Sequence, residues 1–211
     1  MTPIPVTCDT RPRLNFDAEI LLRAQAVRAL LLDVDGVLTP GDLLVGEGGE
    51  VIKRFSTLDG HGLRLLAASG VRPVVVSGRD SPPLRERLRE LGLEAHAVLG
   101  KSRKLPGAED LLRELGLRWE QAAVMGDDWP DLPLLARAQF AACPPVAHPE
   151  VLARVHYRTT AAAGFGAVRE VCDLLLVAQG AYRRLLEQAI AGEEESQIQP
   201  TPLSTSPLRG S

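Results

Sequence analysis

Short runs of consecutive apolar residues alternate along the chain with segments in which apolar residues recur every three or four positions. Apolar runs bounded by turn residues predict buried strands, and the three- or four-residue spacing predicts helices with one buried face. The predicted strands are 27–33, 71–79, 95–100, 121–128 and 139–145, and the predicted helices are 16–26, 60–70, 81–93, 105–117, 131–139 and 165–192. Strands that alternate with helices in this way predict βαβ units and a mainly parallel sheet with both faces covered.

Residues 43–55 predict a different element, a β-hairpin inserted after the first strand. Two short apolar segments flank the sequence GEGGE, whose glycines suit a tight turn. With this hairpin included, the patterns predict an α/β fold of the Rossmann-like type, a three-layer sandwich with a mainly parallel sheet.

Composition changes at both ends of the chain. Residues 1–15 are polar and rich in proline, which predicts a flexible N-terminal arm, and residues 193–211 are acidic and then rich in Pro, Ser and Thr, which predicts a disordered C-terminal tail. Residues 16–192 are predicted to form one domain, since a chain of 211 residues can bury a full core.

Charge and cysteine usage narrow the class of protein. The 24 basic and 27 acidic residues give a net charge of −3, and aromatic residues make up only 4%, so we expect neither nucleic acid nor an anionic membrane as a partner. No apolar signal core and no apolar run of 18 residues is present, which favours a cytoplasmic protein. Three scattered cysteines, Cys8, Cys143 and Cys172, are typical of free thiols in a reducing compartment.

Acidic and small polar residues collect where three of the predicted strands end. In chain order these residues are Asp33, Asp35, Ser77, Gly78, Arg79, Asp127, Asp128 and Asp131. Ligands of open parallel sheets bind beyond the carboxyl ends of the strands, so we expect these side chains to face one crevice. Asp33 and Asp35 can act together only if the strand ends near Asp33, and Gly36 provides the backbone freedom to turn there.

A group of carboxylates without cysteine or histidine favours a hard divalent cation. Mg²⁺ suits such a site better than Zn²⁺ because it prefers oxygen ligands. A bound cation would also attract phosphate, to which the Ser77 hydroxyl could donate a hydrogen bond. Lys101 and Lys104 precede a predicted helix, and an ammonium group from this loop could neutralise both a carboxylate and a phosphoryl group. Composition alone does not choose between the two lysines.

Four segments together resemble the haloacid dehalogenase-like phosphatases: DVDGVLT (33–39), VVVSGR (74–79), GKSRK (100–104) and GDDWPD (126–131). The segments DGHGLRLL (59–66), SGRDS (77–81) and GAVREVCDLLLVAQG (166–180) are similar to the 3-deoxy-D-manno-octulosonate 8-phosphate phosphatase subfamily. The resemblance covers about residues 27–180. It implies a compact core without a large cap domain, which fits a chain with only a hairpin between its first two strands. It also implies a homotetramer in which neighbouring subunits help to close the active sites.

The resemblance implies catalytic roles for the residues that match the family's motifs. Asp33 would be the nucleophile that forms an aspartyl phosphate, and Asp35 would protonate the leaving alkoxide and then activate water. Mg²⁺ would be bound by the Asp33 carboxylate, the Asp35 backbone carbonyl and Asp127. Asp128 and Asp131 would support the metal shell, directly or through waters.

The substrate contacts follow in the same way. Ser77 and Lys104 would hold the phosphoryl oxygens, and Lys104 is preferred over Lys101 because it stands at the family's position. Gly78 belongs to the same phosphate-binding segment. Arg79 and a turn at Asp59–Gly60 are candidates for contact with the sugar acid.

The sequence departs from the family's pattern near the expected substrate entrance. Leu58 stands where many members have arginine, and AGFGA (163–167) replaces Gly-Gly-Arg-Gly-Ala through Ala163 and Phe165. The implied reaction is hydrolysis of 3-deoxy-D-manno-octulosonate 8-phosphate in lipopolysaccharide precursor synthesis. A phosphatase for sialic-acid-type 9-phosphates, a non-catalytic assembly module and a receiver-type phospho-acceptor are the alternatives.

Overall fold

Six parallel strands form the central sheet of the structure, a computed structural model that describes residues 13–192. The strand order is β5–β4–β1–β6–β7–β8. The strands are β1 (Ala29–Leu32), β4 (Arg72–Val76), β5 (Ala97–Val98), β6 (Ala122–Met125), β7 (Phe140–Cys143) and β8 (Tyr157–Arg158). The predicted α/β sandwich with a parallel sheet is confirmed.

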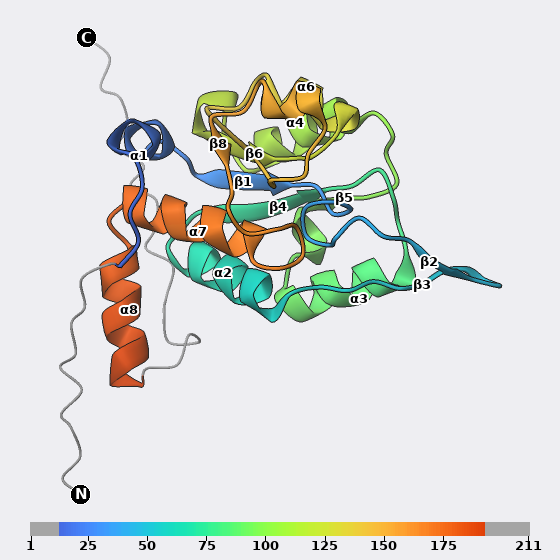
Figure 1. The fold of residues 1–211 in the computed structure, drawn as a ribbon, viewed down its shortest axis with the longest axis horizontal. Coiled ribbons are helices and arrows are strands. Elements are labelled where there is room, and N and C mark those ends of the chain that lie inside the picture. The colour runs from blue at the N-terminus through green and yellow to red at the C-terminus, as the bar shows by residue number, and fades with distance from the viewer. Residues whose placement is uncertain (1–12, 193–211) are drawn as a thin grey trace, which may run out of the picture.

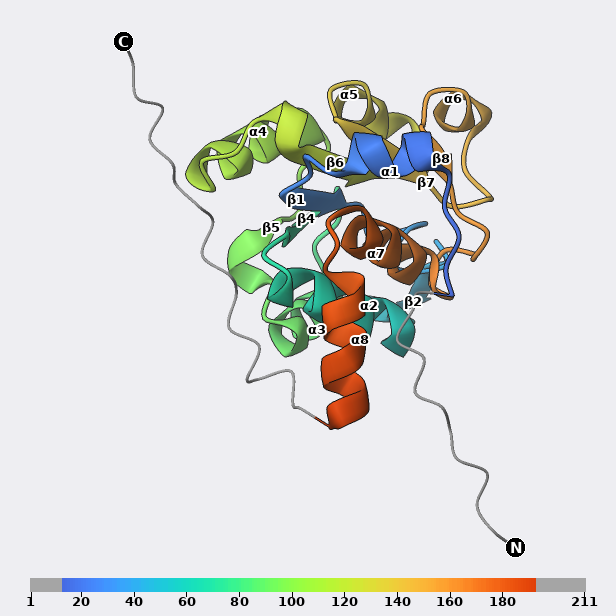
Figure 2. The same ribbon diagram turned by 90° about the vertical axis from the view of Figure 1, so that its left-hand side faces the viewer.

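Helices cover both faces of this sheet (Figures 1 and 2). One layer contains α2 (Thr57–Ala68), α3 (Pro82–Leu91) and α7 (Ala167–Ala178), and the other contains α4 (Lys104–Glu114), α5 (Leu132–Leu135) and α6 (Pro149–Leu152). Helix α1 (Ala18–Ala24) packs with α7, and α8 (Tyr182–Ala191) follows α7 and extends away from the sheet (Figure 1).

Alternate side chains of β1 enter two separate cores. Leu30 and Leu32 belong to the core that includes residues of α2 and α7, whereas Ala29 and Leu31 belong to the core on the α4 side. Because both faces of the strand are buried, its sequence is apolar throughout, as is typical of parallel strands between two helix layers.

The hairpin after β1 consists of β2 (Leu44–Gly46) and β3 (Gly49–Ile52), as predicted. It forms a separate two-stranded sheet and projects from the layered body (Figure 1). Several of its apolar side chains are exposed: Leu43, Leu44, Val45, Val51 and Ile52. Among the described residues 13–192, β1 and β4 are connected only by this hairpin and α2, without a large cap domain.

Three features of the fold differ from the sequence-based prediction. The predicted turn at Asp59–Gly60 is wrong, because Ser56 caps a helix that already begins at Thr57. The predicted helix 165–192 breaks into α7 and α8, where Gly180 adopts a positive φ of 71° that ends α7. The short elements α6 and β8 were not predicted, since four and two residues carry too little periodicity.

The predictions for the two ends fall largely outside the described residues, which exclude 1–12 and 193–211. Within residues 13–192, every helix is too short or too polar to cross a membrane.

Candidate active site

The carboxyl end of β1 lies at the point where the order of the strands changes direction. The chain proceeds from β1 to β4 on one side and later to β6 on the other. Such a switch point opens a crevice beyond the strand ends. Asp33 begins this crevice, and its N–H still donates to the Met125 carbonyl of β6 at 3.1 Å.

A buried lysine joins two of the aspartates. Lys104, the first residue of α4, is 4% exposed, and its Nζ lies 2.7 Å from Asp33 Oδ1 and 2.8 Å from Asp131 Oδ1. Burial lowers the pKa of Lys104, but the two carboxylates outweigh burial and the pKa ends above its ordinary value. The ammonium group therefore stays charged between the two acids. Lys101, in contrast, is exposed.

Asp131 also organises the loop after β6. Its Oδ2 accepts the backbone N–H groups of Asp127, at 3.1 Å, and Asp128, at 3.4 Å. A Cβ atom at Gly126 would lie 2.4 Å from Asp131 Cβ, so only glycine leaves room for this side chain. Both carboxylate oxygens of Asp131 therefore have partners within the protein, Lys104 and the loop after β6. The side chain of Asp128 is exposed.

Asp127 points its carboxylate at the loop after β1. A Cβ atom at Gly36 would lie 2.2 Å from Asp127 Oδ2, and Gly36 has a positive φ of 89° that favours glycine in any case. Asp127 Oδ1 is buried, yet no hydrogen-bond partner lies against it among residues 13–192. Carboxylate oxygens of Asp33, Asp127 and Asp131 lie within 4.8 Å of one another. An unpartnered buried oxygen in a cluster of acids fits a cation ligand.

The electrostatics of the cluster agree with this interpretation. Burial and the nearby Asp131 raise the pKa of Asp33 to about 6, although Lys104 opposes the shift. Burial, Asp33 and Asp131 raise the pKa of Asp127 to about 7. Lys104 lowers both pKa values but does not cancel the upward shifts, so the carboxylates are incompletely neutralised. A hard divalent cation supplies the missing charge with the oxygen ligands it prefers.

The end of β4 contributes the predicted phosphate-binding segment. Ser77 is 1% exposed, and its Oγ accepts the N–H of Arg79 at 3.1 Å. A hydroxyl that accepts one hydrogen bond can still donate another. Space remains beside Gly78, where the nearest atom to an added Cβ would be the Lys101 carbonyl oxygen at 3.9 Å. Arg79 is about half exposed and directs Nε toward Asp35 Oδ2 at 3.9 Å.

Asp35 has a partner that the sequence analysis missed. Lys53, which follows β3, forms an ion pair with Asp35 Oδ1 and has no exposed side-chain surface. The sequence did offer one signal for Lys53, which is the rarity of lysine. Only three of the chain's 24 basic residues are lysines, at positions 53, 101 and 104.

Asp59 and Gly60 serve the packing of α2. Asp59 is 1% exposed and accepts the backbone N–H groups of Arg169, at 2.8 Å, and Gly166, at 3.3 Å, at the start of α7. A Cβ atom at Gly60 would lie 2.3 Å from Arg87 Nη2, so this glycine allows α3 to approach. Both residues therefore have packing contacts, and their contact with the sugar acid stays a prediction.

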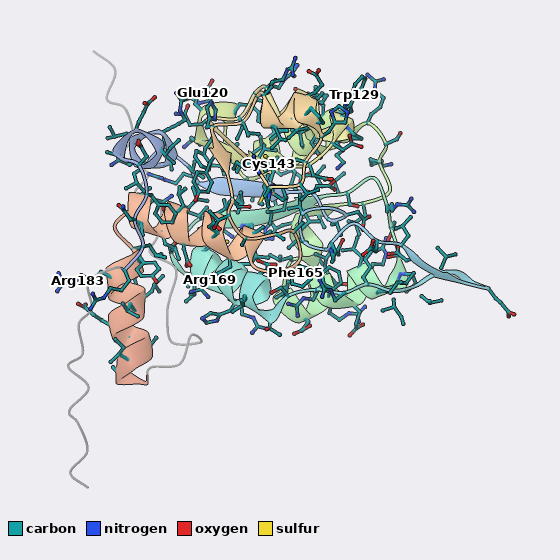
Figure 3. All side chains as sticks on the ribbon, in the orientation of Figure 1. Glu120, Trp129, Cys143, Phe165, Arg169 and Arg183 are labelled. Carbon is teal, nitrogen blue, oxygen red and sulfur yellow. The ribbon has the colours of Figure 1, made fainter. Side chains whose placement is uncertain are left out.

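Two exposed apolar side chains come from different segments, Leu58 from the first turn of α2 and Phe165 from the loop that precedes α7. The Arg54 guanidinium lies 3.7 Å from the centroid of the Phe165 ring, which Figure 3 labels, and Phe165 is 57% exposed. Leu58 is 56% exposed and reaches toward Gly166. The loop is fastened beside the Asp33–Asp35 segment, since the Gly164 N–H donates to the Val37 carbonyl at 3.2 Å. We name Leu58 and Phe165 the apolar rim.

Comparisons with known proteins identify similar sequences and similar folds. The chain is 39% identical over 173 residues to the 3-deoxy-D-manno-octulosonate 8-phosphate phosphatase KdsC of Escherichia coli K12, covering 82% of this chain and 92% of the relative. The solved structure of the phosphatase of that name from Yersinia pestis is 39% identical, with a TM-score of 0.75 over 78% of this chain and 89% of the other. No family model matches the chain.

A further solved structure contains ligands. The 3-deoxy-D-manno-octulosonate 8-phosphate phosphatase of Moraxella catarrhalis, in complex with a magnesium ion, a phosphate ion and KDO, is 34% identical to this chain. Its TM-score is 0.77, and the match covers 81% of this chain and 98% of the other. This chain is therefore similar in fold and sequence to a protein that holds a metal, a phosphate and a sugar acid together.

Proposed function

The chain belongs to the family of 3-deoxy-D-manno-octulosonate 8-phosphate phosphatases, and we propose that it hydrolyses this compound to the free sugar acid and inorganic phosphate. The observation that carries the proposal is the largely buried group of Asp33, Lys104, Asp127 and Asp131 at the switch point of the sheet. The reaction belongs to lipopolysaccharide precursor synthesis, and we place the enzyme in the cytoplasm.

The cofactor is Mg²⁺, the ion held by the relative from Moraxella catarrhalis. We propose that the Asp33 carboxylate, the Asp35 backbone carbonyl and Asp127 bind it. The unpartnered Asp127 Oδ1 supports this assignment, because a buried acceptor without a donor is costly unless a cation completes it. When bound, the ion neutralises charge on the carboxylates and on the phosphoryl oxygens.

Asp33 is held ready to act as the nucleophile. Its Oδ1 accepts the Val34 N–H at 2.7 Å and contacts Lys104 at 2.7 Å, so two donors fix the orientation of the carboxylate. Attack on phosphorus forms the bond between phosphorus and the Asp33 oxygen and breaks the bond to the sugar oxygen. Lys104 and Ser77 donate to the phosphoryl oxygens as their charge is redistributed.

Asp35 moves the protons in both halves of the reaction. It gives a proton to the departing sugar alkoxide, which leaves as the alcohol. It then takes a proton from the water that attacks the phosphorus of the aspartyl phosphate. Hydrolysis releases inorganic phosphate and returns Asp33 and Asp35 to their starting forms.

The apolar rim favours a second candidate substrate. Leu58 and Phe165 stand where the family resemblance implies arginine, and this difference favours a sugar acid that is longer than eight carbons. A sialic-acid-type 9-phosphate has the same phosphoryl group on a longer chain. A non-catalytic module is disfavoured, because Asp33, Asp35, Lys104 and Asp127 are all present.

We also propose a homotetramer. The exposed apolar side chains of the hairpin support it, since such patches mark contact surfaces between proteins. Light scattering should give a mass near four times 22.7 kDa. A mass of one subunit across the working concentration range would reject the assembly without affecting the chemistry.

Phosphate release across a panel of sugar acid phosphates tests the function. We expect turnover of 3-deoxy-D-manno-octulosonate 8-phosphate with Mg²⁺, and none after chelation until Mg²⁺ is restored. A preference for the 9-phosphate would support the second candidate. Turnover that resists chelation, or no release from any sugar acid phosphate, would contradict the proposal.

A further inference from the structure

The two carboxylate oxygens of Asp35 have different surroundings. Oδ1 forms the ion pair with Lys53 Nζ and lies 3.5 Å from Thr39 Oγ1. Oδ2 faces Arg79 Nε at the longer distance of 3.9 Å, and Arg79 is about half exposed. One oxygen is therefore held by the protein, and the other is directed toward the more open side of the site.

Lys53 is itself fixed from two sides. Its side chain has no exposed surface, and its Nζ lies 2.5 Å from Glu50 Oε1 in β3 as well as against Asp35. The Glu50 side chain is 9% exposed. The ammonium group thus connects the base of the hairpin to the loop after β1.

The residue type at position 53 supports a specific role. The chain uses arginine for nearly all of its basic residues, yet Lys53 and Lys104 are lysines, and each contacts an aspartate assigned to the reaction. An ammonium group is a compact charge that can sit against a single oxygen, whereas a guanidinium group tends to engage both. A buried ion pair adds little net stability, so stability alone does not account for burying this charge.

We propose that Lys53 is a positioning residue. Its ion pair with Asp35 Oδ1 orients the carboxylate so that Oδ2 faces the leaving oxygen of the substrate. The inference rests on the proposed function, in which Asp35 Oδ2 passes its proton to the sugar alkoxide as the phosphorus–oxygen bond breaks. In this proposal Lys53 acts through Asp35 and not through a contact with the substrate. Its effect should therefore depend on how much the leaving group needs that proton.

The test compares two leaving groups in wild type and in Lys53→Met, which keeps a long apolar side chain and removes the charge. Cleavage of the sugar acid phosphate releases the sugar acid as an alkoxide, which requires a proton. Cleavage of acetyl phosphate releases acetate, which does not. The ratio kcat/KM reports the steps up to departure of the leaving group. We expect Lys53→Met to lower kcat/KM about 100-fold for the sugar acid phosphate and less than about 3-fold for acetyl phosphate.

A double variant keeps the test informative if Lys53→Met folds poorly. Lys53→Met with Glu50→Gln removes a pair of opposite charges together, and we expect it to fold while keeping the same selective loss. Recovery of sugar phosphate turnover in the double variant would overturn the proposal, because Lys53 would then merely neutralise Glu50. Equal losses on both substrates, or no loss on either, would overturn it as well.

A matched control comes from the other end of the molecule. Arg118 is 83% exposed and pairs with Glu120, which Figure 3 shows on the side away from the hairpin. Arg118→Met should leave both substrates unaffected. If wild type hydrolyses acetyl phosphate but no sugar acid phosphate, the proposed substrate fails instead. Glycerol 2-phosphate, another unactivated alkyl phosphate, then takes its place in the comparison.

Discussion

The charge cluster and the apolar rim differ in burial and in charge. In the cluster, Lys104 and Asp131 are 4% and 2% exposed, and Lys104 pairs with both Asp33 and Asp131. In the rim, Leu58 and Phe165 are 56% and 57% exposed. A change in the cluster leaves a partner charge buried and unpaired, whereas a change in the rim alters only a surface that meets solvent or substrate.

This difference separates two tasks within one site. The cluster determines the chemistry, because its oxygen and ammonium groups fit a cation and a phosphoryl group common to all candidate substrates. We propose that the rim selects which sugar acid fits. Variants in the cluster should therefore change turnover by orders of magnitude, and variants in the rim should change substrate preference by small factors.

The largest effect is expected for Asp33→Asn. The amide cannot accept a phosphoryl group, so we expect turnover to fall roughly 10⁴-fold or more, as happens when a nucleophile is removed. Phosphate release with Mg²⁺ measures the loss, and circular dichroism checks the fold. Normal turnover by this variant would show that Asp33 is not the nucleophile. It would also contradict the proposal that the cluster carries out the chemistry.

Lys104→Met should come next, with effects on both turnover and stability. Removing the ammonium leaves Asp33 and Asp131 buried and unneutralised, which costs about 3–5 kcal/mol of the free energy of unfolding, and turnover should fall about 10²–10³-fold. Denaturant unfolding and kcat measure the two losses.

Adding Asp131→Asn to this variant separates the two losses. The double variant should recover part of the stability, because one buried charge is removed, but none of the turnover. Recovery of turnover would show that Lys104 only neutralises its neighbour.

Binding of Mg²⁺ should depend on pH through Asp33 and Asp127. Their pKa values, raised to about 6 and about 7, mean that protons compete with the cation below pH 7. We expect the affinity for Mg²⁺ to rise about 10- to 100-fold between pH 5.5 and 7.5. Calorimetric titration of wild type measures this, and Asp127→Asn should flatten the profile. An affinity that is constant across this range would contradict the assigned ligands.

The same shifts predict the stability of the metal-free protein. The folded state holds these protons more tightly than the unfolded state, whose carboxyl groups titrate near their ordinary value of 3.8. The unfolded state therefore binds fewer protons as the pH rises, and the free energy of unfolding should fall between about pH 4 and pH 7. Saturating Mg²⁺ should reduce this loss.

The smallest effects are expected in the rim. Phe165→Ala removes the ring under Arg54, and we expect KM for the sugar acid phosphate to change about 3- to 5-fold with kcat unchanged. Leu58→Arg should shift the ratio of kcat/KM between the 8-phosphate and the 9-phosphate by a similar factor. A large loss of kcat in either variant would show that the rim takes part in the chemical step, which would contradict the separation of the two tasks.

The sequence predicted the strands and the acidic ends of β1 and β6 because both signals are local. An apolar run followed by aspartates can be recognised without knowing what lies beside it, and parallel strands bring their ends to one edge. The break at Gly180 was missed because a glycine inside a continuous helical pattern does not reveal its own φ.

Contacts between distant segments could not be predicted in the same way. Lys104 meets Asp131 across 27 residues, and Asp59 caps a helix 107 residues away at Gly166. Contacts across such long separations produce no periodic pattern of residues that could predict them. Lys53 was missed because its pairing with Asp35 depends on how the hairpin folds back onto the loop after β1.

Rapid acid quenching during turnover tests the central claim most directly. Enzyme mixed with 3-deoxy-D-manno-octulosonate 8-phosphate and Mg²⁺ is quenched within one turnover, and peptide mass spectrometry locates the phosphoryl group. We predict that it sits on Asp33, and that it is absent from Asp33→Asn. Continued turnover without a phosphoryl group on Asp33, or with one on another residue, would contradict the account.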